Sequence, residues 1–221
     1  VIPPADWEDA VNGGYYSAEL RGTTPFVIRG RYPSTKKLKR YLDADFPEVL
    51  RCANIMQNTA WTVNERVFQV MEEVWVRNLQ VGMPASKKYE FPPAPIAKTD
   101  KPVDLTGAKK EAFNLWKAQT RSLHAQESKR QAEIVSIGRT IKMAREMKNH
   151  AAFWYVYRVD FRGRFYAATT GLSPQGNDHG KALLLFHKGK PLGRNGMRWL
   201  KIHGAGKYGI DKVSADAQEK W

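Results

Sequence analysis

One short run, Asp160-Phe161-Arg162-Gly163-Arg164-Phe165-Tyr166, holds the side chains in this sequence that are best suited to chemistry. Guanidinium groups can pair with phosphate oxygens through two parallel hydrogen bonds, and aromatic rings can stack on a base or a sugar. A glycine between the two arginines lets the backbone turn tightly and approach a ligand closely. This combination favours nucleic-acid binding, although an ordinary turn would also account for the Asp and the Gly.

The charge of the chain indicates the same kind of partner. Lys and Arg number 36 against 22 Asp and Glu, which gives a formal charge of +14 at pH 7. Eleven basic and three acidic residues lie between Arg158 and Lys212. Because such a surface attracts polyanions, nucleic acid is the expected partner, and a basic surface that serves only solubility is the alternative.

Neither a metal site nor a membrane span is indicated by the sequence. Asp160, Asp178 and Asp211 form no paired-carboxylate motif, and the five His residues show no ligand spacing. Cys52 is the only cysteine, so no intramolecular disulfide can form, and we expect it to lie in the core. No apolar run approaches the roughly 20 residues of a membrane span, so we expect no membrane partner.

Hydrophobic spacing predicts one long helix ahead of this region. Asp45 can cap its start, Pro47 suits the first turn, and Glu48 complements the helix dipole. Apolar residues then recur at alternating steps of four and three, and they are Val49, Ala53, Met56, Ala60, Val63, Val67, Val70 and Val74. We expect this stripe to pack against the rest of the protein.

A second helix is predicted from Glu111 to Asn149. The Pro-rich residues 81–110 before it favour an extended linker or surface loop. The predicted helix is apolar near both ends but polar from His124 to Glu133, so we expect it to project into solvent or across a groove. Its basic residues would then be free to meet phosphate, and a solvated charged face is the alternative.

Alternating aromatic residues predict a β-hairpin around the Asp160–Gly163 break, with strands at 155–159 and 164–167. A further helix is predicted around Met197 to Ile202. The expected fold class is α+β and mainly α, with long helices followed by a small antiparallel β-hairpin.

Several motifs follow one another in an order typical of a known family. The Asp160–Tyr166 run is followed by Ser173-Pro174-Gln175-Gly176-Asn177-Asp178, Gly189-Lys190-Pro191-Leu192-Gly193 and Trp199-Leu200-Lys201-Ile202-His203-Gly204-Ala205. In these motifs the chain closely resembles the single-subunit RNA polymerases of phages and mitochondria. Asn54–Asn64 and Gly13-Gly14-Tyr15 extend the resemblance to nearly the whole chain, although residues 81–120 match only in position and character.

The resemblance implies a division of the chain. Residues 1–80 would be the end of an N-terminal domain with the long helix, and 81–110 a Pro-rich linker. Residues 111–150 would be a thumb-like helical pair that grips the RNA–DNA hybrid, and 151–221 the start of the palm. In this family the palm segment contacts the template strand and the hybrid near the active site.

The resemblance also implies roles for individual residues. Arg162 and Arg164 would hold backbone phosphates, and Tyr166 would lie near a template base or sugar. Gly163 would permit the close turn, and Asp160 would orient the arginines or brace the hairpin. Further candidates for phosphate contacts are Lys181, Arg130 and Arg139.

Catalysis is expected to require sequence outside this chain. Polymerases of the family use two aspartates that hold two Mg²⁺ ions, and those motifs lie beyond the matched residues. We therefore expect no catalytic residue and no Mg²⁺ ligand here, and no activity from this chain alone.

The expected partners are template DNA, the RNA–DNA hybrid and the remaining fingers and palm sequence, which a separate chain could supply. The resemblance implies the cytoplasm of an infected bacterium, with the mitochondrial matrix as the second expectation. Two alternatives stay open: a free-standing basic nucleic-acid-binding module without polymerase function, and a purely structural fragment.

Overall fold

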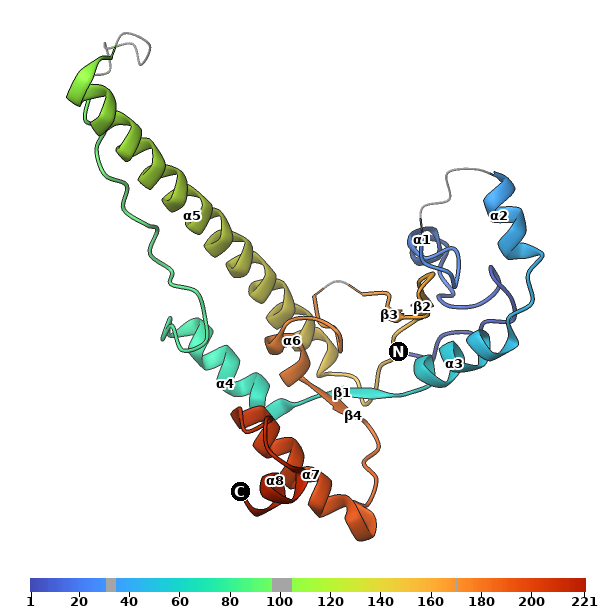
Figure 1. Ribbon diagram of the computed structural model, residues 1–221. Helices are drawn as coiled ribbons and strands as arrows, with labels where there is room; N and C mark the ends of the chain where they lie inside the picture. Colours follow the sequence, from blue (N-terminus) through green and yellow to red (C-terminus); the bar gives the residue numbers. More distant parts are fainter. Residues whose placement is uncertain (31–34, 97–104, 170) are drawn as a thin grey trace. The chain divides into compact units, whose positions relative to one another are not determined.

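Helices make up about half of the described chain, and four short strands form two antiparallel pairs (Figure 1). A computed structural model describes residues 1–30, 35–96, 105–169 and 171–221, with the backbone alone for 35–38. The helices are α1 (Ala18–Thr23), α2 (Thr35–Leu42), α3 (Pro47–Gln57), α4 (Glu65–Val76), α5 (Gly107–Met147), α6 (Asp178–Ala182), α7 (Gly193–Tyr208) and α8 (Ala215–Lys220). The strands are β1 (Trp61–Val63), β2 (Tyr157–Val159), β3 (Phe165–Ala167) and β4 (Leu184–Phe186). The expected α+β, mainly α fold class is confirmed.

The chain divides into two compact units, Val1–His187 and Lys188–Trp221. The candidate site residues all belong to the first unit. The division into N-terminal, thumb and palm parts stays a prediction.

The prediction of one long helix over the Val49–Val74 stripe is wrong, because a strand interrupts it. Strand β1 pairs with β4, and Trp61 N donates to Phe153 O at 2.8 Å. Asn64 then starts α4 as a new helix, its side chain accepting from Val67 N at 3.3 Å. Aromatic and β-branched residues at 61–63 favour a strand, and this local signal outweighs the helical spacing of the valines.

The interruption also changes which residues of the stripe are buried. Ala53 is fully buried in α3, as the stripe predicts. In α4, however, Phe68 and Met71 are buried while Val70 is 57% exposed. The apolar face of α4 therefore differs from the one that a continuous helix would present.

The predicted start of this region is partly confirmed. Pro47 occupies the first turn of α3 and Glu48 lies in that turn, as expected. The N-cap, however, is Phe46 and makes no side-chain hydrogen bond, so Asp45 is not the cap. Cys52, expected in the core, is half-buried.

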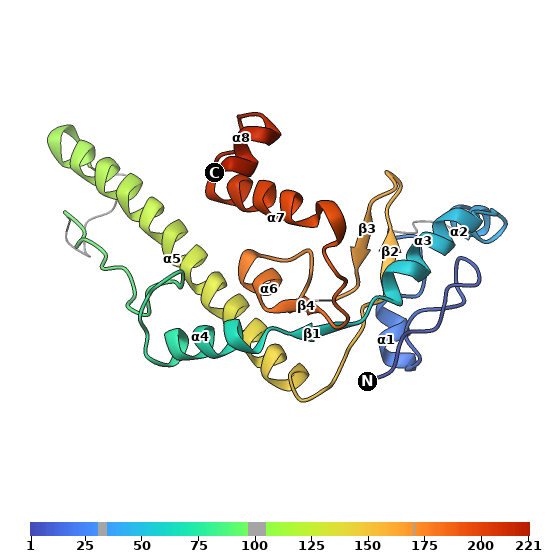
Figure 2. The same cartoon turned by 90° about the horizontal axis from the view of Figure 1, so that it is seen from below.

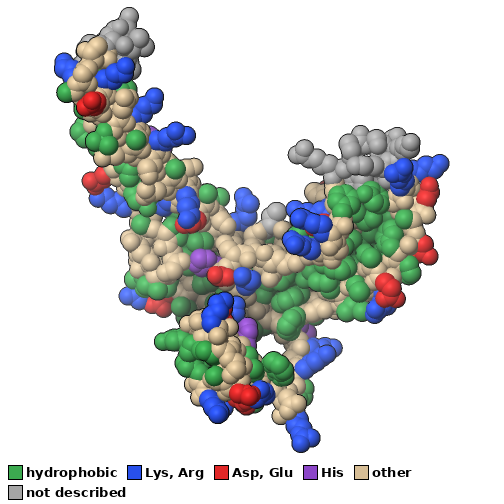
Figure 3. Space-filling view, viewed as in Figure 1, with side chains coloured by type: hydrophobic (Ala, Val, Ile, Leu, Met, Phe, Trp, Pro, Cys, Tyr) green, Lys and Arg blue, Asp and Glu red, His purple; other side chains and the backbone are tan. Residues whose placement is uncertain are grey.

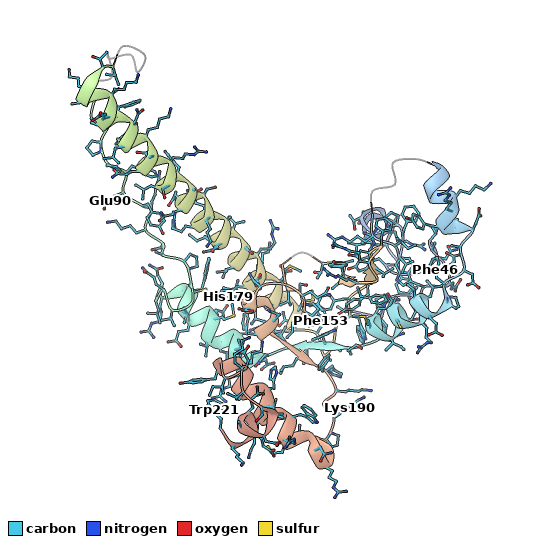
Figure 4. All side chains as sticks on the ribbon, viewed as in Figure 1. Phe46, Glu90, Phe153, His179, Lys190 and Trp221 are labelled. Atoms are coloured by element: carbon cyan, nitrogen blue, oxygen red, sulfur yellow. The ribbon has the colours of Figure 1, made fainter. Side chains whose placement is uncertain are left out.

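The predicted second helix is confirmed as α5, a single helix of 41 residues. At 1.5 Å per residue it is about 60 Å long. The helical pair that the resemblance implied for this region is not formed: α5 lies beside residues 79–96, which are not helical (Figure 1). We call residues 79–96 the flanking segment. Trp116 Nε1 of α5 donates to Pro92 O of the flanking segment at 2.9 Å. Figure 4 shows Glu90 of the same segment beside α5.

Only one end of α5 is anchored in the core. Ile137, Ile141 and Ala144 are buried together with Phe68 of α4 and Leu183, which follows α6. Near the start of α5, by contrast, Leu115 is 63% exposed. The helix therefore has a fixed base and a start that carries little buried apolar surface, which agrees with the expected projection.

A second cluster ties the first 30 residues to the hairpin. Trp7, Val27, Ala53 and Val156 are buried against one another. Trp7 Nε1 donates to the carbonyl of Tyr157 at 3.1 Å. This cluster fixes residues 26–30 beside β2, where they contribute to the candidate site.

Tyr155 is buried between the core and the hairpin, and its hydroxyl has no hydrogen-bond partner within the described residues. Desolvation by burial raises the pKa of this phenol, so it is neutral at physiological pH. Because a buried unpaired hydroxyl destabilises the fold, Tyr155→Phe should raise the free energy of unfolding by about 1 kcal/mol. Urea unfolding followed by circular dichroism measures this change, and a decrease would show that the hydroxyl has a stabilising partner.

The second unit is a helix pair. Helix α7 confirms the helix predicted around Met197–Ile202 and is longer than predicted. Arg198 NH2 donates to Asp216 Oδ1 of α8 at 2.6 Å, and Arg198 NH1 pairs with Glu219. Trp199 remains 63% exposed.

Candidate nucleic-acid interface

The predicted hairpin is confirmed, with Asp160–Gly163 turning the chain between its strands (Figure 2). Tyr157 pairs with Ala167 and Val159 with Phe165. Gly163 has φ of +75°, a left-handed conformation that side chains other than glycine adopt at a cost. The turn therefore requires glycine at this position.

The carboxylate of Asp160 organises this turn. Its Oδ1 accepts from the backbone N–H groups of Arg162 at 2.8 Å and Arg164 at 3.1 Å. Its Oδ2 accepts from the Tyr166 hydroxyl at 3.0 Å and lies 3.6 Å from Arg162 Nε. The backbone hydrogen bond from Arg164 is the main cause that lowers the pKa of Asp160, opposed by partial desolvation. The carboxylate is therefore ionised at neutral pH and holds the turn.

Both arginines of the turn point their side chains to solvent. The Arg162 side chain is 73% exposed, and Arg164 is also exposed. Asp160 accepts hydrogen bonds from both of their backbone amides, and of the two side chains only that of Arg162 also pairs with it, at 3.6 Å among the described residues. The guanidinium groups are thus presented on a turn whose backbone is fixed by hydrogen bonds.

Tyr166 is held by two contacts on different sides. Its hydroxyl donates to Asp160, and the guanidinium carbon of Arg29 lies 4.6 Å from its ring centroid. The ring is half-buried and lines an open cleft.

The outer edge of β3 is occupied by the side chain of Gln175. Its Nε2 donates to Phe165 O at 2.7 Å, and its Oε1 accepts from Ala167 N at 2.7 Å. The amide thus bonds to β3 in the way that a neighbouring strand would. These bonds fix the Ser173–Asn177 loop, part of the second matched motif, against the hairpin.

The cleft beside Tyr166 has a volume of about 1220 Å³. One wall is the base of α5, with Ser136 and Arg139, and another is the hairpin with Tyr166. A groove of about 450 Å³ continues from it along α5, past Arg139, Ser136 and Gln131. Figure 3 shows Lys and Arg side chains spaced along α5. The cleft could accommodate a strand of nucleic acid between a basic helix and the hairpin.

Arg139 is exposed and lines both the cleft and the groove, and its contact with phosphate stays a prediction. Lys181 does not line the cleft; its ammonium group pairs with Asp178 Oδ1 at 2.7 Å on α6. The structure thus brings Arg139 and Tyr166 to the cleft, with Arg162 and Arg164 on the adjoining turn. Lys181 lies apart from them.

The structure argues against a phosphate contact by Arg130. Its side chain is only 10% exposed and that of Glu127 only 7%, and Arg130 NH2 lies 2.7 Å from Glu127 Oε1. Arg130 NH1 donates to the carbonyls of Ala85 at 2.7 Å and Ser86 at 3.1 Å. The polar middle of α5 therefore binds the flanking segment, which explains why the sequence there lacks apolar residues.

Glu127 completes this buried network. It accepts from Arg130, from Gln131 Nε2 at 2.7 Å and from Tyr89 N at 3.3 Å. The hydrogen bond from Arg130 is the main cause that lowers the pKa of Glu127 to about 2, against the effect of desolvation. In the sequence, the only signal for this network is that Glu127 and Arg130 carry opposite charges three residues apart on a helix. That spacing does not show that the pair is buried.

The residues that the structure describes do not fit the Mg²⁺ that the resemblance implies for a complete polymerase. No three His, Cys, Asp or Glu side chains within the described ranges come together as ligands. Both oxygens of Asp160 are already engaged by the turn. We assign no metal ligand to them.

The family model described as DNA-dependent RNA polymerase matches residues 190–221. The chain is 38% identical over 216 residues to the DNA-directed RNA polymerase of Enterobacteria phage K11, covering 96% of this chain and 22% of that protein. It is 37% identical to T7 RNA polymerase of Escherichia phage T7, covering 96% and 23%. The mitochondrial DNA-directed RNA polymerase of Neurospora crassa is 31% identical, covering 99% and 15%.

The chain belongs to the single-subunit RNA polymerase family. It spans less than a quarter of the length of these three relatives. The matches to these polymerases include the hairpin, the cleft and α5, while the family model covers most of the second unit. In the parts of the chain that are described, no helix has both the length and the apolar character needed to cross a membrane.

Two residues of this polymerase region were not found by sequence reasoning. Glu127 was overlooked because the middle of α5 was interpreted as solvent-facing. Arg29 carried no signal, because it lies far from the hairpin in the sequence and in no motif. Its position follows only from the packing of residues 26–30 on β2.

Proposed function

We propose that this chain forms part of a DNA-directed RNA polymerase and binds template DNA and the RNA–DNA hybrid in the cleft between α5 and the hairpin. One observation carries the proposal. Asp160 fixes a turn that presents the side chains of Arg162 and Arg164, and Tyr166 next to it lines a cleft whose far wall carries Arg139. Arginine side chains and an aromatic ring at one cleft suit a phosphate backbone with its sugars and bases.

Each cation has a distinct part in this proposal. Arg162 and Arg164 take phosphates at the turn, and Arg139 takes a phosphate from the side of α5. Gly163 provides the close turn and Tyr166 contacts a base or a sugar. Because each neutralised phosphate releases counterions, binding should weaken steeply with salt.

The catalytic aspartates and the Mg²⁺ ions of the proposed enzyme would come from polymerase sequence outside these 221 residues, either joined to this chain or on a separate one. When bound there, Mg²⁺ would stabilise the charge that develops during phosphoryl transfer. Residues 111–150 would act as the thumb and 151–221 as the start of the palm. The phage relatives support the cytoplasm of an infected bacterium as the place of action.

Replacing both Arg162 and Arg164 with Ala should weaken hybrid binding by between about tenfold and a hundredfold at low salt, since two charge-assisted contacts are lost. The slope of log Kd against log salt should fall by about two. Fluorescence anisotropy with a labelled RNA–DNA hybrid measures both quantities. The matched control replaces Arg21 and Arg66, two exposed arginines that do not line the cleft, with Ala. Equal losses in the two double variants would contradict the proposal.

A run-off transcription assay tests the place of catalysis. This chain alone should make no RNA, whereas the chain combined with the remaining polymerase sequence should. RNA from the chain alone would contradict the proposal that its catalytic residues lie elsewhere. Hybrid binding without any polymerase activity in either case would favour a free-standing binding module.

A further inference from the structure

Arg29 belongs to none of the motifs of the hairpin, yet it is in contact with the ring of Tyr166. Its guanidinium carbon lies 4.6 Å from the ring centroid. The residue is exposed and lines the same cleft as Tyr166 and Arg139. Besides Tyr166, the cleft is therefore lined by arginines from separate parts of the chain, among them Arg29 from the first 30 residues and Arg139 from α5.

The backbone at Arg29 is fixed to the hairpin. Arg29 N donates to Val159 O at 2.6 Å, and Val159 N donates to Val27 O at 2.8 Å. Ile28 thereby forms a parallel bridge with Val159. Arg158 precedes Val159 on β2, and its Nε donates to Phe26 O at 2.7 Å. The position of Arg29 is thus set by β2 itself.

The turn of the hairpin also rests on this segment. A side-chain carbon added at Gly30 would lie 2.9 Å from the tip of the Phe161 ring, so the ring of the turn packs directly on the backbone at Gly30. Arg29 is therefore held between the bridge at Ile28 and the contact at Gly30. Residues 26–30 form no regular element, yet the backbone at Arg29 is fixed. A fixed position on a loop favours a binding role for Arg29 over a side chain that is only solvated.

The chemistry of this arrangement suits a phosphate. A guanidinium that stacks on an aromatic ring uses its flat face, and its N–H donors lie in the plane and stay available. In the described part of the chain, no carboxylate forms an ion pair with Arg29. One face of Tyr166 is covered by Arg29, so a base or sugar would approach the ring from its other face or its edge.

We propose that Arg29 binds a nucleic-acid phosphate next to the sugar or base that contacts Tyr166, a step that rests on the proposed function of the cleft. The 27–29 segment then supplies a third phosphate-binding element, beside the turn and α5. Arg29 also holds the Tyr166 ring in the orientation in which the strand meets it.

The test uses the whole 221-residue chain and a labelled RNA–DNA hybrid. Arg29→Gln should weaken binding about tenfold and lower the salt slope by about one, because one phosphate contact is lost. Arg29→Lys keeps the charge but not the planar fork, so it should keep the slope while losing part of the affinity. Arg21→Gln, which removes the same charge outside the cleft, should change neither, and thermal melts confirm that each variant is folded.

Three results would overturn the proposal. If Arg29→Gln behaves as Arg21→Gln while Arg162→Ala with Arg164→Ala still weakens binding, Arg29 makes no contact and the function of the cleft stands. If none of these variants weakens binding, the function of the cleft fails as well. If Arg29→Gln has no effect on the salt slope in a Tyr166→Ala background, Arg29 acts only by holding the ring. A slope that still falls by about one in that background supports a direct phosphate contact.

Discussion

Asp160→Ala should weaken hybrid binding by about tenfold or more, although the change removes a negative charge from a basic surface. Charge alone predicts the opposite, because a more positive surface attracts nucleic acid more strongly. The expected loss comes from the turn. The Asp160 carboxylate accepts hydrogen bonds from the backbone amides of Arg162 and Arg164 and from the Tyr166 hydroxyl, and these bonds fix the turn. Without it, three side chains of the proposed interface lose their common support.

Asp178→Ala provides the matched control for this prediction. This change also removes one carboxylate close to the cleft. It breaks the ion pair between Asp178 and Lys181 and so releases the Lys181 ammonium group. Hybrid affinity should stay the same or rise slightly. Anisotropy titrations of both variants at several salt concentrations make the comparison. If Asp160→Ala bound as tightly as Asp178→Ala, the carboxylate would not organise the interface.

Glu127→Ala should release the flanking segment from α5. The change leaves the buried Arg130 guanidinium without its carboxylate, and Tyr89 N without its acceptor. Breaking one partner of a buried pair is strongly destabilising, whereas replacing both by apolar groups of similar size is often neutral. Hydrogen exchange in residues 79–96 should therefore become about tenfold faster or more in Glu127→Ala. It should largely recover in the double variant Glu127→Leu with Arg130→Met.

Arg130 and Arg139 can be separated by the same salt titration that defines the interface. Both lie on α5, but only Arg139 is exposed at the cleft. Arg139→Ala should lower the salt slope of hybrid binding by about one. Arg130→Ala should leave the slope unchanged, because its charge is used within the protein. A reduced slope in Arg130→Ala would restore Arg130 as a phosphate ligand.

The network at Glu127 should also respond to acid. Its pKa in the folded protein, about 2, is lower than the ordinary value of 4.5, so ionised Glu127 stabilises the fold above pH 4.5. This contribution is lost as the pH falls from 4.5 towards 2. Exchange in residues 79–96, corrected for its intrinsic pH dependence, should rise over that range in the native chain. Glu127→Gln should abolish the rise.

Local signals in the sequence predicted the elements that depend on neighbouring residues. The β-hairpin and the α5 helix each follow from the pattern of neighbouring side chains, and the family resemblance implied the role of Asp160 in the turn. The long helix over the Val49–Val74 stripe failed because β1 pairs with β4, a strand more than 100 residues away. Residues 61–63 carry a local strand preference, but only the distant partner strand decides between it and the helical spacing of the valines.

The same distinction applies to the candidate site. The turn that carries Arg162, Arg164 and Tyr166 could be predicted because its residues lie in one short run, while their contacts with nucleic acid stay a prediction. Arg130 is a phosphate candidate by its place on a polar helix and by the family resemblance, but its burial depends on the flanking segment, which periodicity does not place. Arg29 meets Tyr166 only because residues 27–29 bond to β2. Residues brought together by such contacts require the folded structure to be recognised.

The amide of Gln175 has a consequence for association between copies of the protein. A two-stranded hairpin normally has two open edges, each a template on which another chain can add a strand and start aggregation. Here residues 27–29 bond to one edge and the Gln175 side chain to the other. The hairpin can therefore expose its basic turn to a ligand without offering a free strand edge on either side, which protects it from self-assembly into β-structure.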